Sequence, residues 1–354
     1  MSIIANISSL KSRQILPHTI IFIPYMIPYK LRPQLFVLLL VFILQGCSNN
    51  LPGVLKNDKI DAGKRSDFHD LTNEALGYLK INGFKRLKLM MSKDLNQNSY
   101  TEQIVDHISN HLSESKYSLF NEYYIVNKYR DADTIKSTGT GINDFGFFYQ
   151  SPEKEMYIAF FLPEKAENKY MISLIFSKFD YGWKISELDV EPYAINGKTG
   201  PELFKMAKEA YSKNYLIDAV NLGALASTCM KPVDILQYPD EGDLHTFYGQ
   251  IVNEANDKYK FPFTLTDVPS KPRIIRIFNQ TDDKGSFPMI QYLTAINLKD
   301  TTAIKNENTQ IRKAIGKVMP GLDKDKKYVF YAAFNEKPSS LKEVDRFEMT
   351  DRLQ

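Results

Sequence analysis

Cysteine and histidine are scarce in this sequence, with two and five residues, respectively, among 354. No Gly-x-Ser-x-Gly segment is present, so the nucleophile elbow of the α/β-hydrolases is excluded. Cys229 falls near the end of an alanine-rich segment that is predicted to be helical, where a free cysteine usually packs as a small buried apolar residue. The composition therefore disfavours catalysis by a serine or cysteine nucleophile.

Long apolar runs are also missing, because no segment reaches the roughly 20 residues that a membrane-spanning helix needs. The longest run covers residues 35–44 and reads LFVLLLVFIL. A run of this length behind basic residues is typical of the apolar core of a signal peptide. The sequence thus predicts a leader over residues 1–46 that is removed, with either Met1 or Met26 as its first residue.

The end of this run, Leu44-Gln45-Gly46-Cys47, resembles the processing signal of bacterial lipoproteins. The resemblance implies cleavage before Cys47, a diacylglyceryl group on its thiol and a palmitate-type chain on its new amino terminus. Two or more acyl chains hold a protein durably on a bilayer, since each buried methylene contributes about 0.8 kcal/mol. With Ser48 after the cysteine, the resemblance implies an envelope protein, anchored in the outer membrane of a two-membraned bacterium and facing the periplasm or the outer surface. A secretory signal with an incidental cysteine is the alternative.

Removal of the leader changes the charge balance of the chain. Residues 1–46 hold four basic residues and no acidic one, so the remainder holds 41 basic against 42 acidic residues. The net charge falls from +3 to −1, and no block of five like charges occurs. A nucleic-acid partner, which requires clustered lysine and arginine, is therefore not expected.

The remaining 308 residues are enough to bury a core without disulfides, and we predict an α+β fold of two domains. Each is expected to be an antiparallel sheet backed by helices, and a helical hairpin is expected to join them. The predicted segments are a flexible tether over 47–65, an α+β domain with a curved sheet over 66–192, the hairpin over 193–232 and a small α-β-β-α-β domain over 233–354.

Hydrophobic periodicity gives the individual elements. Helices are predicted over 66–79, 101–112, 201–230 with a break near Lys213-Asn214, 241–258 and 301–318. Strands are predicted over 118–129, 144–150, 155–162, 170–178, 183–190, 273–279, 289–297 and 327–334. Ser66 is the expected N-cap of the first helix, and Thr301 or Thr302 that of the last. The chain beyond Lys337 is expected to be irregular.

The segment 176–185, FSKFDYGWKI, resembles the last hairpin of cone-shaped domains similar to nuclear transport factor 2. The resemblance implies a curved sheet that wraps a helix and often encloses a pocket. Cystatin-like and other one-sheet α+β folds fit the order of elements as well. The aromatic run of Phe145, Phe147, Phe148 and Tyr149 is then a candidate ligand platform, with core packing of a curved strand as the alternative.

The candidate metal ligands are His107, His111 and Glu114, which share one face of the helix predicted over 101–112 if that helix continues. Ile108 stands where the metalloprotease pattern requires glutamate. Two further segments resemble a phosphate-binding loop and a calcium-binding loop but lack residues that these motifs require. Gly139 and Gly141 have no following lysine for a phosphate loop, and the stretch around Asp323 and Asp325 lacks the glycine and final glutamate of a calcium loop.

The resemblance to lipoproteins and the lack of a complete catalytic motif together favour a non-enzymatic envelope lipoprotein without a cofactor. It is expected to bind a small apolar ligand or to interact with another envelope protein, and to contact the membrane through lipid on Cys47. A metal-dependent or other hydrolase is the alternative, and it would depend on His107, His111 and Glu114.

Overall fold

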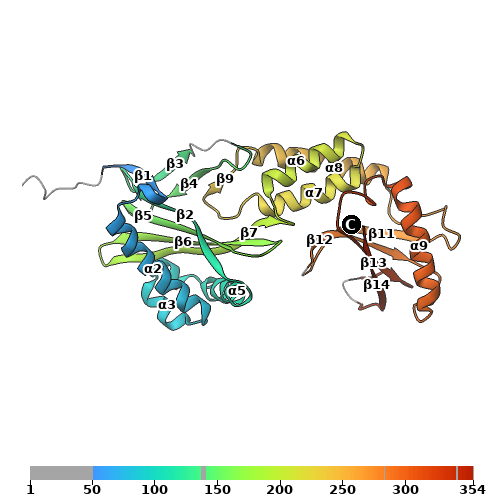
Figure 1. Ribbon diagram of the computed structural model, residues 1–354, viewed down its shortest axis with the longest axis horizontal. Coiled ribbons are helices and arrows are strands. Elements are labelled where there is room, and N and C mark those ends of the chain that lie inside the picture. The colour runs from blue at the N-terminus through green and yellow to red at the C-terminus, as the bar shows by residue number, and fades with distance from the viewer. Residues whose placement is uncertain (1–50, 137–140, 283, 340–341, 354) are drawn as a thin grey trace, which may run out of the picture. The chain divides into compact units, whose positions relative to one another are not determined.

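The computed structural model describes residues 51–353, except 137–140, 283 and 340–341. The predicted leader and Cys47 lie outside these residues. The described chain has the predicted α+β fold (Figure 1). None of the described helices combines the length and the apolar character needed to cross a membrane.

The first sheet has six strands in the order β1-β2-β5-β6-β7-β8, and all its neighbours are antiparallel. Its strands are β1 (Gly53–Lys56), β2 (Tyr117–Val126), β5 (Glu155–Pro163), β6 (Lys169–Phe179), β7 (Gly182–Ile195) and β8 (Lys198–Thr199). Register shifts interrupt the β2–β5 and β6–β7 ladders, and such bulges increase the twist of a sheet. The strands predicted over 170–178 and 183–190 form the β6–β7 hairpin, and Gly182 after its turn has φ +103°, a conformation that favours glycine.

Both faces of this sheet are buried. In β5, Tyr157 and Phe161 pack into one core cluster, whereas Ile158 and Phe160 pack into a second. Successive side chains of a strand point to opposite faces, so these two clusters lie on opposite sides of the sheet. This explains why β5 is a continuous apolar run rather than an alternating one.

Four helices cover the first face: α2 (Ala62–Lys80), α3 (Phe84–Met90), α4 (Lys93–Gln97) and α5 (Thr101–Glu114). Side chains fill this face, where the Phe68 ring stacks on that of Tyr157 with centroids 4.1 Å apart. The prediction of α5 is confirmed, but α2 begins earlier than expected. Its N-cap is Asp61, whose carboxylate accepts from Lys64 N at 3.1 Å, and Ser66 lies inside the helix.

The predicted flexible tether over 47–65 is wrong from Gly53 onward. There β1 pairs with β2 in the register Gly53↔Val126 to Lys56↔Tyr123, and a 3-10 helix (Asn57–Lys59) leads into α2. All four residues of β1 are exposed. An edge strand held by backbone hydrogen bonds needs no apolar side chains, so its sequence is easily mistaken for a loop.

The second face is covered by a three-stranded sheet and a helical hairpin. The sheet consists of β3 (Ala132–Lys136), β4 (Gly146–Gln150) and β9 (Leu236–Gln237), and the hairpin of α6 (Gly200–Ser212) and α7 (Leu216–Cys229). The predicted break at Lys213-Asn214 is confirmed. Residues of α7 belong to two cores. Ala226 packs in the cluster on the second face of the first sheet, and Ala219 packs in the cluster of the C-terminal sheet.

The C-terminal sheet has five strands rather than the three predicted. They are β10 (Phe263–Thr264), β11 (Arg273–Asp282), β12 (Gly285–Leu293), β13 (Tyr328–Phe334) and β14 (Arg346–Arg352), in that order. The expectation of an irregular end beyond Lys337 was wrong, since β14 pairs with β13 over seven residues. Its alternating exposed and half-buried residues form an edge strand. The β12–β13 pair is parallel, so this sheet is mixed rather than purely antiparallel.

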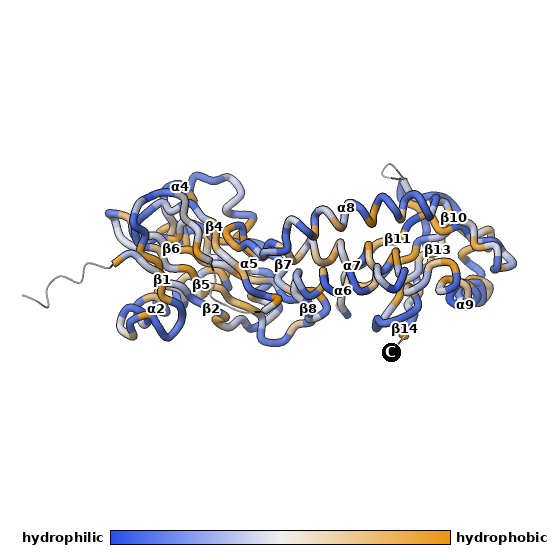
Figure 2. The backbone as a smooth tube through the Cα atoms, turned by 90° about the horizontal axis from the view of Figure 1, so that it is seen from above, coloured by the Kyte–Doolittle hydropathy of each residue, from blue (hydrophilic) through white to orange (hydrophobic). Residues whose placement is uncertain are grey.

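Two helices accompany this sheet, α8 (Glu241–Lys258) and α9 (Thr301–Val318), and both have the predicted bounds. Hydrophilic and hydrophobic residues alternate along α8 (Figure 2). The helix α9 forms the crossover that a parallel pair requires. Its N-cap is Asp300, whose side chain accepts from Ala303 N at 3.0 Å, so the expected threonine caps were one or two residues too late.

Candidate functional site

A cavity of about 390 Å³ lies between the α6–α7 hairpin, strands β11 and β12, and the segment that precedes β13. Neither the hairpin nor the C-terminal sheet could form it alone. The hairpin is fixed at its start by a capping box, in which Thr199 and Glu202 satisfy each other's backbone donors. The cavity is therefore walled by elements that regular hydrogen bonding holds in place.

One wall of the cavity is apolar. Leu203 and Met206 come from α6, Leu222 and Leu225 from α7, and Phe287 from β12. Leu222 is only partly buried and packs against both neighbouring cores. This wall can receive an apolar portion of a ligand without removing polar groups from water.

The lining also includes amides and a hydroxyl, partly on the same elements, α7 and β12, as the apolar residues. Asn196 donates through Nδ2 to Ser286 O at 2.6 Å, and its Oδ1 accepts from Ser286 N at 2.8 Å. Asn279 Nδ2 donates to Asn221 O at 2.7 Å. Asn221 itself is 6% exposed, and its Nδ2 has no hydrogen-bond partner among the described residues.

The least exposed charged groups at the cavity are paired, whereas Lys198, Glu209, Lys213 and Asp325 also line it and are exposed. Asp218 Oδ2 and Lys326 Nζ are 3.0 Å apart, with side chains 10% and 11% exposed. Lys326 also donates to the carbonyls of Gly321 and Lys324. Burial raises the pKa of Asp218 to about 6, although the charge of Lys326 opposes the shift. Lys327 at the rim pairs with Glu167 at 3.0 Å.

The predicted metal ligands are only partly brought together. His107 Nε2 and His111 Nε2 are 3.3 Å apart, which matches two nitrogens on one tetrahedral zinc with bonds of about 2.0–2.1 Å. Burial, followed by the charge of His107, lowers the pKa of His111, and Glu114 opposes this. In the part of the chain that the structure describes, however, no group of three or more histidine, cysteine or acidic residues could hold a metal ion. The histidine pair could thus supply two ligands to a metal ion, and the described residues add no third.

The candidate aromatic platform is mostly core. Phe147 and Tyr149 are 2% and 4% exposed and pack in the cluster on the second face of the first sheet, and Phe145 packs against this cluster. Only Phe148 presents its ring to solvent, at 61% exposure. Packing therefore explains this run, apart from Phe148.

The remaining candidates form no site in the described residues. Cys229 is a buried free cysteine, and burial raises its pKa to about 12, which keeps the thiol protonated. Gly141 has φ +134°, while Gly139 lies outside the described residues. Asp323 and Asp325 are exposed and form no calcium loop, although Asp325 lines the cavity described above.

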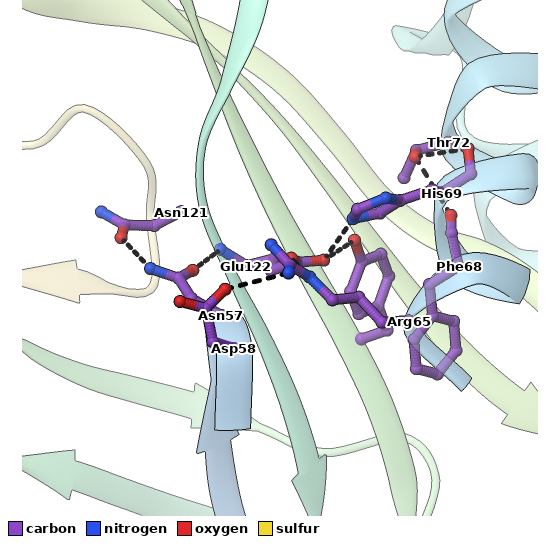
Figure 3. A network of polar contacts seen from close by, with 9 residues as sticks. Asn57, Asp58, Arg65, Phe68, His69, Thr72, Asn121 and Glu122 are labelled. Carbon is purple, nitrogen blue, oxygen red and sulfur yellow. Dashed lines mark hydrogen bonds and ion pairs between the residues drawn. The ribbon is translucent and has the colours of Figure 1, made fainter. Parts of the chain in front are cut away.

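A polar network that the sequence analysis missed centres on Glu122 in β2. Its side chain is fully buried and accepts from Arg65 Nε and from Tyr157 OH, the latter at 2.7 Å. His69 Nε2 lies 3.0 Å from Glu122 Oε2 (Figure 3). Arg65 also pairs with Asp58 at 3.0 Å. The only sequence signal was a glutamate inside an aromatic strand.

Both carboxylate oxygens of Glu122 are thus occupied by protein groups. Arg65 and His69 lie one turn apart on α2, so the network attaches this helix to the sheet. A saturated carboxylate cannot serve as a base or a ligand without breaking these bonds. We therefore assign the network to stability and the cavity to function.

No protein-family model, curated protein or solved structure matches this chain. The functional assignment consequently depends on the geometry of the sites.

Proposed function

We propose that the chain is a lipid-anchored protein of the bacterial cell envelope that binds a small molecule in the cavity between the α6–α7 hairpin and β12. The observation that carries the proposal is the cavity itself. Its volume of about 390 Å³ falls within the range of roughly 300–1,000 Å³ typical of ligand sites. Its lining combines apolar residues with polar groups, as in such sites.

The apolar residues of the lining favour a ligand with an apolar body, and the least exposed charges beside them are already paired. Asp218 is already paired with Lys326, and Lys327 with Glu167. A charged group of the ligand placed beside Asp218 and Lys326 would have to compete with their ion pair, which is costly in a buried position. The apolar portion of the ligand packs on Leu222 and Leu225.

The anchor belongs to the same proposal and is supported by the sequence. The segment Leu44-Gln45-Gly46-Cys47 and the apolar run before it favour acylation of Cys47 and placement in the outer membrane. The membrane is then the first partner of the protein, and the small molecule the second.

The cavity is tested by filling it. Leu222→Trp places an indole in the cavity, and Thr228→Trp adds the same group to an exposed site of α7 that does not line the cavity. Wild type and both variants are purified from envelopes, and the small molecules extracted from each are compared by mass spectrometry. We expect one species in wild type and Thr228→Trp that Leu222→Trp loses at least tenfold. Indistinguishable extracts from all three proteins would contradict the proposal.

A further inference from the structure

The strand register brings several segments to one end of the six-stranded sheet. The chain enters β1 at Gly53, which is paired with Val126 at the end of β2. Val126 is paired with Glu155 at the start of β5, and the β6–β7 turn lies beyond the Phe179–Gly182 pair. We call this the entry end, defined by residues 51–52, 127–131, 151–154 and 180–181 (Figure 1).

Large apolar and aromatic side chains are exposed at the entry end. Leu51 is 82% exposed, Tyr129 66% and Tyr181 47%. Lysines accompany both tyrosines, with Lys128 Nζ 5.2 Å from the Tyr129 ring centroid and Lys93 Nζ 5.4 Å from that of Tyr181. Tyrosine beside lysine is the combination enriched at membrane–water interfaces, where the ring lies at headgroup level and the ammonium group stays in water.

The loops that carry these residues are held in place. Asn127 is buried and donates through Nδ2 to Ser151 Oγ at 2.7 Å, and its Oδ1 accepts from Tyr149 OH at 2.7 Å. At the other tip, the Tyr181 ring stacks on Phe179 with centroids 5.1 Å apart. The exposed rings are therefore presented by ordered segments rather than by loose ones.

The distance to the anchor is short, and this step depends on the proposed acylation of Cys47. Leu51 follows Cys47 by four positions along the chain, with three residues between them. Whatever the conformation of this segment, its four positions span at most about 14 Å. Because β1 begins two residues after Leu51, the entry end cannot move far from the bilayer surface.

We propose that the entry end lies on the bilayer, with Leu51, Tyr129 and Tyr181 at the level of the lipid headgroups. The lipid on Cys47 and these side chains then hold the first domain in one orientation. The acyl chains keep the protein on the membrane, and the contact determines which end of the sheet faces it.

The experiment uses nitroxide labels on the full acylated chain in vesicles of phosphatidylcholine and phosphatidylglycerol. Tyr129→Cys and Tyr181→Cys place the label at the entry end, and Cys229 is buried, so it does not react. Phe120→Cys is the matched control, because Phe120 is 40% exposed on the same strand as Val126. The two residues are six positions apart, which corresponds to about 20 Å along the strand.

The readout is the ratio of label collisions with oxygen, which enriches in the bilayer, to those with a water-soluble nickel complex. We expect this ratio to be at least threefold higher at positions 129 and 181 than at 120. Equal, water-like ratios at all three positions on protein that floats with the vesicles would overturn the contact and leave the anchor intact. If the protein did not float with the vesicles, the anchor would fail and the contact with it.

Discussion

Removal of the Tyr157 hydroxyl tests whether the Glu122 network stabilises the first domain. Tyr157 is fully buried, and its OH donates to Glu122 Oε2 at 2.7 Å. Tyr157→Phe deletes this donor without opening a cavity, and His69 remains 3.0 Å from the same oxygen. Hydrogen bonds to charged groups contribute about 1.5–3 kcal/mol, so we expect the variant to lose about 2 kcal/mol of unfolding free energy.

The unfolding assay can follow this domain alone. Trp183 is the only tryptophan, and its ring lies 5.0 Å from that of Phe68 in the same core. Urea unfolding followed by its fluorescence therefore reports on the region of the network. Glu122→Gln is expected to lose more than Tyr157→Phe, because the amide cannot replace the carboxylate for Arg65 and His69.

The matched control is Tyr123→Phe on the neighbouring residue of β2. Tyr123 is 5% exposed and packs in the core on the other face of the sheet, away from Glu122. Its variant is expected to change stability by less than about 0.5 kcal/mol. Equal midpoints for Tyr157→Phe and Tyr123→Phe would refute the assignment of Glu122 as a stabilising acceptor.

Three further predictions concern single residues. The raised pKa of Asp218, about 6 against an ordinary 3.8, means that the folded state favours its protonated form. The contribution of protonated Asp218 to the free energy of unfolding is complete below pH 3.8 and is lost as pH rises through 6. Across this range the wild type is expected to lose up to about 3 kcal/mol of unfolding free energy relative to Asp218→Asn. Parallel curves of unfolding free energy against pH would contradict this. Cys229 should resist Ellman's reagent at pH 8 in the folded protein and react in urea, and rapid reaction without denaturant would show that the thiol is accessible. Gly182→Ala should destabilise by about 1–3 kcal/mol because φ is +103°, whereas Gly77→Ala inside α2 should stabilise slightly; a thermal melt with both shifts of the same sign would speak against the backbone argument.

Much of the fold could be predicted because its elements have strong periodicity. The bounds of α8 and α9 match the periodic segments, and the strands of the first sheet fall on aromatic and β-branched runs. The edge strands β1 and β14 were missed, since their exposed residues carry little hydrophobic signal. Neighbouring backbone, rather than side-chain pattern, decides that these segments are strands.

The sites were harder to predict because their residues are distant in sequence. Glu122 meets Arg65 across 57 positions, and Asn279 meets Asn221 across 58. No local pattern specifies such pairs, which arise only when helices and sheets pack. The histidine pair was predictable from its spacing on one helix, as the 3.3 Å separation of the two Nε2 atoms shows.

Our main proposal is that the mature protein begins at an acylated Cys47. Both the placement of the protein in the cell envelope and the proposed membrane contact depend on this modification. Intact mass spectrometry of the protein extracted from membranes with detergent tests this directly. We expect a chain of residues 47–354 that carries a diacylglyceryl group and one further acyl chain, and a Cys47→Ser variant that keeps its leader or leaves the membrane. An unmodified chain, or one that begins elsewhere, would contradict it.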